Sequence, residues 1–322
     1  MARPCRPYCM SGDLESVEFN GWPCVRLTSG ELEGVVGAFP GGRLLSLRVA
    51  GQELLYVDRS RAGEQPPSVI GDLRAFKRGF GFPLWGGDKT WIAPQAAWWE
   101  AMPPLELDSG RYDLEKEGPA VRLRSRPCPE TGLVVERRLE FGPASTISLE
   151  ESIENTSSAP IRRGIWNVTQ LLRPARVWLP VEKGHIRPYP EEGQSEALAS
   201  RVIDSCESFS GIVCEEALHF KYGAVPREGQ LLTMFQGEQD VLMLRRFAID
   251  QNAKAYAHGS AVEVYNSPTL PYLEVEVHAP LRELQPGERQ TARQDWSFCV
   301  VARGKEFGPG LFQLFPDSGP AG

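Results

Sequence analysis

The sequence predicts an all-β protein, built as one large antiparallel β-sandwich. Its apolar residues fall into about sixteen short segments separated by turn-forming residues, a pattern typical of many strands joined by tight connections. The 32 glycines and 27 prolines are spread along the chain, and hydrophobic residues make up 41% of it. We therefore expect a single domain over residues 14–303, a loose leader over residues 1–13 and a frayed C-terminal tail over residues 304–322.

The predicted strands follow one another closely. In the first half of the chain they cover residues 17–19, 25–28, 32–39, 43–49, 53–57, 111–116, 120–125, 132–141, 146–155 and 162–170. In the second half they cover residues 218–222, 231–236, 241–247, 261–266, 272–278 and 294–302. Asn20 and Gly21, between the first two strands, form the dipeptide most typical of a two-residue hairpin. Residues 58–78 predict a polar loop with a short helix over residues 70–77, and residues 182–211 predict a polar surface excursion.

Residues 78–99 stand apart because they combine four of the eight tryptophans with several glycines and prolines. Glycine and proline break helices, and the stretch does not alternate cleanly as a strand would, so we interpret it as a long loop. Loops that carry aromatic and charged side chains are common places for binding sites. The alternative is that these tryptophans only close one end of the core.

Composition excludes several classes of partner. The net charge is −7 and there is no basic tract, so we expect neither nucleic acid nor a membrane as a partner. The N-terminus lacks the apolar stretch of a signal peptide, and no apolar run has the length of a membrane span. With an odd count of seven cysteines, the chain suits a reducing compartment, and we expect a cytoplasmic protein. The cysteine and histidine spacings match no zinc site, so the sequence predicts neither a metal nor a cofactor.

Carboxylates provide the clearest candidates for chemistry, since the familiar hydrolase, nucleotide-binding and metalloprotease signatures are absent. In the strand over residues 272–278, Glu274, Glu276 and His278 share one face, and the residues between them are apolar. If the polar face lines a cleft, neighbouring carboxylates would raise one another's pKa and give a general base. If it meets bulk solvent, it is an ordinary outer face.

Lysines and tryptophans suggest the kind of ligand. Lys89 and Lys221 have aromatic neighbours in the sequence, and a desolvated lysine can act as an acid or hold hydroxyl groups. Trp85, Trp91 and Trp98 offer flat apolar surfaces suited to the C–H face of a sugar. Without a phosphate-binding loop, these groups favour a small, neutral carbohydrate.

The order of several motifs resembles the galactose mutarotase-like superfamily, over residues 33–303. Gly-Gly-Arg-Leu-Leu-Ser-Leu at residues 41–47, followed by Gly-Gln-Glu-Leu-Leu at residues 51–55, resembles the opening of aldose 1-epimerases. Gly-Gly-Asp-Lys-Thr-Trp-Ile-Ala-Pro-Gln at residues 86–95, Ile-Trp-Asn-Val-Thr-Gln-Leu at residues 165–171 and Phe-Lys-Tyr-Gly at residues 220–223 resemble a poorly characterised bacterial branch that lacks the usual catalytic histidines. The resemblance implies the large β-supersandwich fold.

It also implies a sugar epimerase, with Glu274 as the base by position. Trp85 stands where the first family histidine would be, and Asn167 or Thr169 where the second would be. The acid would then have to come from Lys89, Lys221 or His219.

Two hypotheses follow from these residues. The first is an aldose 1-epimerase-like isomerase with Glu274, Lys89 and Lys221 as catalytic groups, and the alternative is a carbohydrate-binding module without catalysis. A polysaccharide lyase or hydrolase is a weaker third reading. The candidate substrate-binding residues are Trp85, Asp88, Trp91, Gln95, Trp98, Trp166, Gln170, His219 and Glu276.

Overall fold

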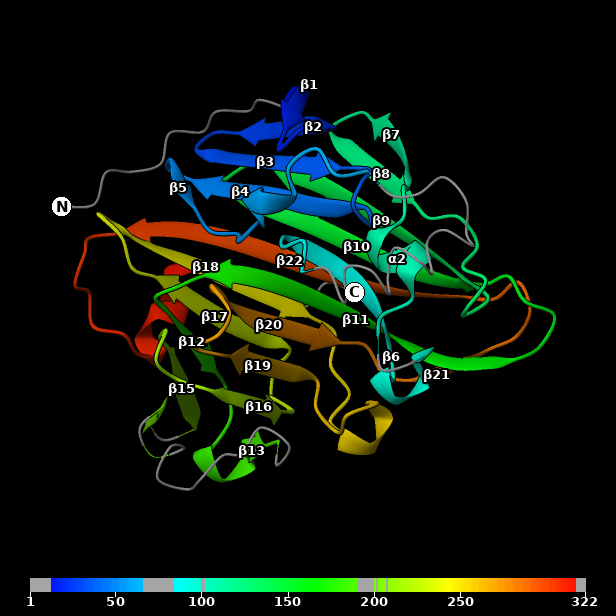
Figure 1. Cartoon of the computed structure of the whole chain (residues 1–322). Coiled ribbons are helices and arrows are strands. Elements are labelled where there is room, and N and C mark those ends of the chain that lie inside the picture. Colours follow the sequence, from blue (N-terminus) through cyan, green and yellow to red (C-terminus); the bar gives the residue numbers. More distant parts are fainter. Residues whose placement is uncertain are drawn as a thin grey trace.

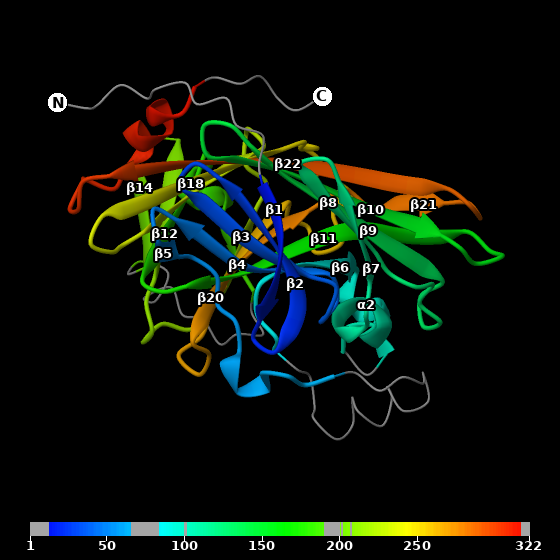
Figure 2. The ribbon, with the colours of Figure 1, turned by 90° about the horizontal axis from the view of Figure 1, so that it is seen from above.

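The computed structural model describes residues 13–65, 84–99, 102–189, 200, 202–206 and 208–316. Within these residues the chain forms two large antiparallel sheets that pack face to face, so the predicted β-sandwich is confirmed. Figure 1 shows the first sheet, from β3 and β4 through β11 to β16, in front of β18 and β22 of the second sheet. Figure 2 shows the same two layers from above.

The first sheet has twelve strands among the described residues. Its main path is β1 (Asp13–Phe19), β2 (Trp22–Ser29), β3 (Leu32–Gly37), β4 (Arg43–Val49), β6 (Asp88–Ala93), β11 (Ile161–Leu172), β20 (Tyr272–His278), β19 (Val262–Asn266), β16 (Phe220–Ala224) and β13 (Arg187–Pro188). The two strands outside this path are β5 (Gln52–Glu53), which pairs with β4, and β21 (Arg282–Leu284), which pairs with β11.

The second sheet has ten strands within the same described ranges. Their order is β14 (Ile203–Cys206), β15 (Phe209–Cys214), β12 (Ala175–Leu179), β17 (Gln230–Phe235), β18 (Asp240–Phe247), β22 (Arg289–Val301), β10 (Thr146–Asn155), β9 (Leu133–Gly142), β8 (Ala120–Arg124) and β7 (Asp113–Glu117). The short helices are η1 (Arg59–Arg61), η2 (Gln95–Ala97), α2 (Leu105–Ser109), η4 (Lys183–His185), η6 (Ala253–Ala255) and η7 (Pro309–Leu314). No helix among the described residues is long and apolar enough to span a membrane.

Period-two patterning creates the core, as the sequence predicts. On β10, Ile147, Leu149 and Ile153 are buried, and on β20 Leu273 and Val275 are buried from the opposite sheet. All five side chains belong to one apolar cluster between the sheets. The predicted Asn20-Gly21 hairpin also forms, because both residues adopt positive φ angles and connect β1 to β2.

The largest difference from the sequence interpretation is β6. We expected residues 78–99 to form a loop, but Asp88–Ala93 is a fully buried strand of the first sheet, between β4 and β11. Its polar residues hid the pattern, because Asp88 and Thr90 face inward to buried polar partners and not to solvent.

Two further expectations need correction. The predicted surface excursion over residues 182–211 contains β13 and β14 and the start of β15, and β12 precedes it. In the predicted tail, η7 places Leu311 and Phe315 in a buried cluster against Trp178, so residues up to 316 are not frayed. The helix expected over residues 70–77 lies outside the described residues.

Candidate functional site

Three central strands of the first sheet place the polar residues of interest on one face. β6, β11 and β20 are consecutive, and Lys89, Val168 and Glu276 lie in one row across them. Alternate residues such as Ile92 and Val275 belong to the core between the sheets. Lys89 and Glu276 therefore project from the opposite side, which we call the outer face of the first sheet.

Aromatic rings cover one end of this outer face. Trp91 and Trp166 are neighbours across β6 and β11, and their ring centroids lie 5.1 Å apart. Trp98, from the segment after η2, stacks on Trp166 at 5.4 Å and donates its indole N–H to the Ile92 carbonyl at 2.7 Å. These three tryptophans form a packed aromatic wall of which Trp91 and Trp98 keep small exposed edges, of 7% and 9%.

Lys89 lies beside this wall. Its ammonium nitrogen is 4.2 Å from the centroid of the Trp91 ring, and the residue is only 2% exposed. Burial lowers the pKa of Lys89 to about 8, and the nearby Arg43 also lowers it, while Glu274 acts in the opposite direction. A lysine with this pKa can give up a proton near neutral pH.

Glu274 and Gln170 form a second polar pair on the outer face. They are register partners on β20 and β11, and the Gln170 amide donates to Glu274 Oε1 at 2.8 Å. Gln170 is fully buried, and its Oε1 accepts no hydrogen bond from another described residue. Glu274 is partly exposed. The pair thus places one partly exposed carboxylate beside a buried amide oxygen that has no hydrogen bond among the described residues.

Lys221 on β16 joins two further carboxylates. Its ammonium nitrogen is 2.8 Å from Glu263 Oε2 and 3.1 Å from Glu276 Oε1, and the Trp166 indole donates to Glu276 Oε2 at 2.8 Å. Burial disfavours the charged lysine, but Glu276 and Glu263 together raise the pKa of Lys221 above its ordinary value. Lys221 is therefore a permanent cation here, and not a proton donor at neutral pH.

The two carboxylates that share Lys221 titrate differently. Burial raises the pKa of Glu276 to about 8, despite the opposing charge of Lys221. Burial would also raise the pKa of Glu263, but His278, Lys221 and His258 hold it well below its ordinary value. The polar face of β20 is thus not an ordinary solvated face, because Glu276 and His278 are each 1% exposed.

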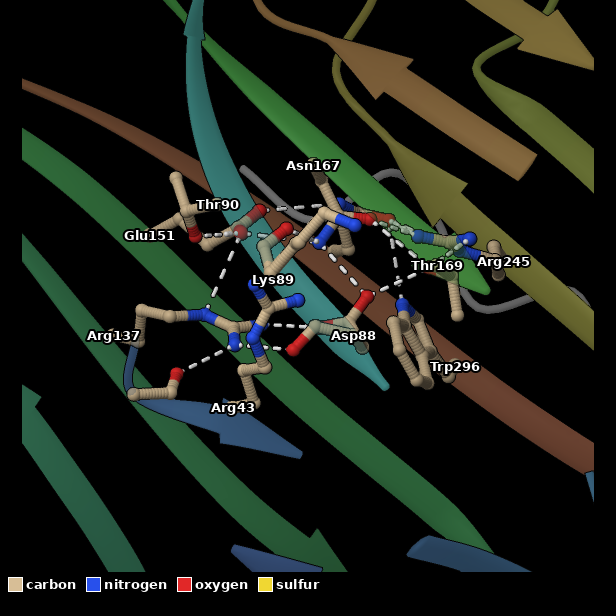
Figure 3. A network of polar contacts seen from close by, with 12 residues as sticks. Arg43, Asp88, Lys89, Thr90, Arg137, Glu151, Asn167, Thr169, Arg245 and Trp296 are labelled. Atoms are coloured by element: carbon tan, nitrogen blue, oxygen red, sulfur yellow. Dashed lines mark hydrogen bonds and ion pairs between the residues drawn. The ribbon is translucent and has the colours of Figure 1, made fainter. Parts of the chain in front are cut away.

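Two predicted binding residues are enclosed by other parts of the protein. Trp85 is fully buried against Trp22 and Phe39 and donates its indole N–H to Ser109 Oγ at 2.8 Å. Asp88 faces inward between the sheets, where it pairs with Arg137 (Figure 3). We therefore exclude Trp85 and Asp88 from the site, because neither can reach a ligand on the outer face.

The remaining predicted residues lie at its margins. Gln95 is exposed on η2, and its backbone N–H is 3.5 Å from His258 Nε2. His219 packs against Tyr265 with ring centroids 6.1 Å apart, and Tyr265 is the register partner of Glu274. Both residues are close to the outer face without belonging to its central cluster.

Asp88 belongs instead to a buried polar network on the other side of β6 (Figure 3). Asn167 and Thr169 donate to Asp88 Oδ2 at 3.0 and 2.6 Å. Arg245 from the second sheet donates to Thr169 Oγ1 at 2.9 Å and also bonds Asn167 Oδ1. Since these fully buried groups bind one another across the two sheets, we assign the network to the stability of the fold and not to a ligand.

Sequence reasoning missed three participants, Glu263, His258 and Tyr189. The Tyr189 hydroxyl donates to Glu263 Oε1 at 2.6 Å, and His258 Nδ1 is 3.0 Å from the same oxygen. The sequence pattern could have revealed Glu263, because Val-Glu-Val-Tyr on β19 alternates between apolar and polar residues in the same way as β20. His258 and Tyr189 lie outside regular alternation, so no local pattern could reveal them.

A surface pocket elsewhere on the molecule is a weaker candidate. It has a volume of about 670 Å³ and is lined by Gln52, Glu53 and Arg173, among others. The Glu53 carboxylate is held by the Leu47 and Leu55 backbone N–H groups, and Arg173 binds the Ser267 carbonyl. Since these charges are engaged by the backbone, we place the candidate site on the outer face.

Comparisons with known proteins agree with this architecture. The model of a family described as a domain of unknown function, DUF4380, matches residues 108–299, which is more than half of the chain. No curated protein matches the sequence.

Solved structures with the same fold include three bacterial proteins. The Slr1438 protein from Synechocystis sp. PCC 6803 is 11% identical, with a TM-score of 0.57 over 92% of this chain and 100% of that chain. A galactose mutarotase-like protein from Lactobacillus casei is 8% identical, with a TM-score of 0.55 over 86% of this chain and 100% of that chain. Another, from Clostridium acetobutylicum, is 8% identical, with a TM-score of 0.53 over 90% and 99%. The expected galactose mutarotase-like fold is therefore confirmed.

Proposed function

Because the chain belongs to the DUF4380 family, whose description assigns no activity, we propose a function from the outer face: a mutarotase-like epimerase that acts on a small sugar. The observation that carries the proposal is the placement of Lys89 and Glu274 on the two strands that flank β11. Gln170 and Trp91 lie beside them. Sugar ring opening requires an acid and a base, and an amide and an aromatic ring are groups suited to holding the sugar.

The reaction needs one proton removed and one supplied. In our proposal, Glu274 takes the proton of the anomeric hydroxyl, while Lys89 gives a proton to the ring oxygen. The bond between the ring oxygen and the anomeric carbon breaks, leaving an aldehyde and a new hydroxyl. Rotation of the aldehyde and the reverse proton transfers then close the ring on its other face, so both residues regain their starting states.

The other residues of the outer face hold the sugar. The free Oε1 of Gln170 accepts a hydrogen bond from a hydroxyl group, and the edges of Trp91 and Trp98 contact apolar C–H groups. Glu276 and Lys221 form the polar boundary on the side of β16. This arrangement needs no histidine as the acid, because Lys89, with its lowered pKa, can donate the proton.

A carbohydrate-binding module without catalysis is the second candidate. It is favoured by the deep burial of Lys89, which leaves little of its surface for a substrate to contact. The same groups would then bind a sugar without transferring protons.

The test measures exchange between the α and β anomers of a panel of aldoses by NMR saturation transfer. We expect the protein to exceed the buffer rate on at least one sugar, and Glu274→Gln to reduce that rate by about 100-fold or more. Glu283→Gln on β21, an exposed position of the same residue type, serves as the control and should retain the rate. We also expect the rate to fall as the pH rises through about 8 and Lys89 loses its proton.

Calorimetry with the same sugars separates the two candidates. Saturable binding of a sugar whose anomers exchange no faster than in buffer would support the binding module and exclude the epimerase. If the protein neither binds nor interconverts any sugar of the panel, both candidates are wrong.

A further inference from the structure

Three potential metal ligands meet at the end of the outer face, next to Lys221. His258 comes from the segment between η6 and β19, Glu263 from β19 and His278 from the end of β20. We propose that they bind one divalent transition-metal ion of the zinc class. No sequence motif predicts this site, because the three residues are not spaced as in any familiar zinc motif.

The distances between the ligand atoms suit such an ion. His258 Nδ1 is 3.0 Å and His278 Nε2 is 3.5 Å from Glu263 Oε1, and all three atoms lie within 4.8 Å of one another. Tetrahedral ligands at roughly 2.0–2.2 Å from zinc are about 3.3–3.6 Å apart. Small side-chain movements would therefore open a coordination site at the centre of the group.

His278 supplies an independent reason to expect a ligand. The residue is 1% exposed, and neither ring nitrogen makes a hydrogen bond of normal geometry to any residue that the structure describes; Nε2 has only the 3.5 Å contact with Glu263 Oε1. A buried polar group without a hydrogen bond is unfavourable by about 1–3 kcal/mol. A metal ion bound to Nε2, on the side that faces Glu263, would give this nitrogen a partner.

Surrounding residues fix the orientation of the three ligands. The Trp166 ring stacks on His278 at 5.1 Å and meets the edge of His258 at 4.9 Å. Tyr189 donates a hydrogen bond to Glu263 Oε1, and Lys221 holds Oε2 at 2.8 Å. Lys221 thus leaves only one carboxylate oxygen for the metal. Such outer contacts are typical of metal sites in which ligands are held before the ion binds.

Three protein ligands leave one tetrahedral position for water or a ligand oxygen. The His258 side chain is 15% exposed, so the group can be reached from solvent. The competing explanation is a metal-free carboxylate that accepts hydrogen bonds from Tyr189 and His258. In that case the Gln95 N–H at 3.5 Å from His258 Nε2 keeps the imidazole proton on Nδ1.

Metal titration of the chelator-treated full chain distinguishes these explanations. We expect calorimetry to show one Zn²⁺ or Co²⁺ per chain, and Co²⁺ to give the visible absorption of a tetrahedral complex. Co²⁺ should also quench part of the tryptophan fluorescence, because Trp166 contacts both histidine rings.

Three variants and a control locate the ion. His258→Gln, Glu263→Gln and His278→Gln should each weaken binding by more than the roughly 10–100-fold that loss of an outer contact causes. His185→Gln, at an exposed position on η4, should leave it unchanged. If His278→Gln fails to fold, the affinity of His258→Gln, a variant at a partly exposed position, still tests the proposal.

The proposal is overturned if no stoichiometric binding occurs, or if His258→Gln binds as tightly as the unchanged protein. Neither result depends on any sugar, so this proposal and the epimerase proposal can fail separately.

Discussion

Lys89 is a charged side chain in a place where an apolar one would be more stable. It is 2% exposed, and burial lowers its pKa from 10.5 to about 8. That difference corresponds to about 3 kcal/mol of unfavourable interaction with the charged form. A residue held at this expense of stability is more easily explained by chemistry than by folding.

Replacing Lys89 with methionine should therefore separate stability from function. We expect Lys89→Met to increase the free energy of unfolding by about 1–4 kcal/mol at pH 7, while anomer exchange is lost. Urea denaturation measures the first effect. Lys254→Met, at an exposed lysine, should change stability by less than about 0.5 kcal/mol.

The pH dependence provides a second check on the same substitution. The folded pKa of Lys89 lies below the unfolded value, so the unfolded chain binds more protons between pH 8 and 10.5. The free energy of unfolding of the native protein, relative to Lys89→Met, should therefore rise across that range. A flat difference would contradict the lowered pKa.

Asp88, the next residue in the chain, has the opposite role. Its carboxylate is fully buried and compensates Arg137 between the sheets. We expect Asp88→Asn to destabilise the fold by about 3–5 kcal/mol, because it removes the closer of the two carboxylates that pair with the buried Arg137 and leaves only Glu151, at 3.7 Å. Asp295→Asn breaks only the exposed pair with Arg293 and should cost less than about 1 kcal/mol, as measured by urea denaturation.

These neighbours also show the limit of sequence reasoning for single residues. Alternation correctly placed Glu274, Glu276 and His278 on one face of β20. It cannot separate Asp88 from Lys89, because the sequence predicts a loop for their segment, in which both side chains could reach a ligand. A buried strand whose polar groups are satisfied on both faces has no apolar period to detect.

At the scale of elements, β6 depends on the two glycines that precede it. Gly86 and Gly87 have φ angles of +93° and +76°, and a Cβ atom on Gly87 would lie 2.5 Å from the Leu44 carbonyl oxygen. Only glycine combines this backbone conformation with such a close approach to β4. The position of Lys89 on the outer face therefore depends on Gly87, two residues before it in the chain.

Alanine substitutions can separate the two contributions. Gly51→Ala has a similar φ of +83° with nothing within 4 Å, so it should cost about 1–2 kcal/mol from conformation alone. Gly87→Ala adds the clash with Leu44 and should cost more, and it should also reduce anomer exchange through displacement of β6. Equal losses of stability in the two variants would show that the close approach is unimportant.

Elements with strong local signals were predicted well, and elements without them were missed. The Asn20-Gly21 hairpin and β10 combine turn chemistry with clean alternation, and both form as expected. β12, β14 and β15 were missed. The apolar residues of β12 and β15 occupy both faces of the second sheet, since Val177 lies in the core between the sheets and Trp178 packs near η7, and this blurs the period. β14 has only one buried residue, Ile203, and so has no period to detect.

At the scale of the whole molecule, η7 closes the side of the second sheet that faces away from the first sheet. Leu311 is 3% exposed and packs in a cluster with Trp178 and Leu232, whereas Leu314 on the same helix is 40% exposed. A long-range contact of this kind leaves no mark in the local sequence, which is why the tail looked unstructured.

The two leucines of η7 form a matched pair for testing this closure. We expect Leu311→Ala to lower the free energy of unfolding by about 2–5 kcal/mol, because it leaves a cavity against the sheet. Leu314→Ala should change it by less than about 0.5 kcal/mol. Thermal denaturation compares the two variants, and similar midpoints would contradict the packing of η7.

The two-sided use of β6 also limits how this sequence can change in evolution. Inserting or deleting one residue between Gly87 and Trp91 would exchange the faces of Asp88 and Lys89. It would place the Lys89 ammonium beside the Arg137 guanidinium between the sheets and remove the closer carboxylate partner of Arg137, while the outer face would lose its lysine. Relatives that keep the fold are therefore expected to vary β6 by substitution or by shifts of two residues. Loop insertions should gather in turns such as the one at Gly51, where the chain has open space.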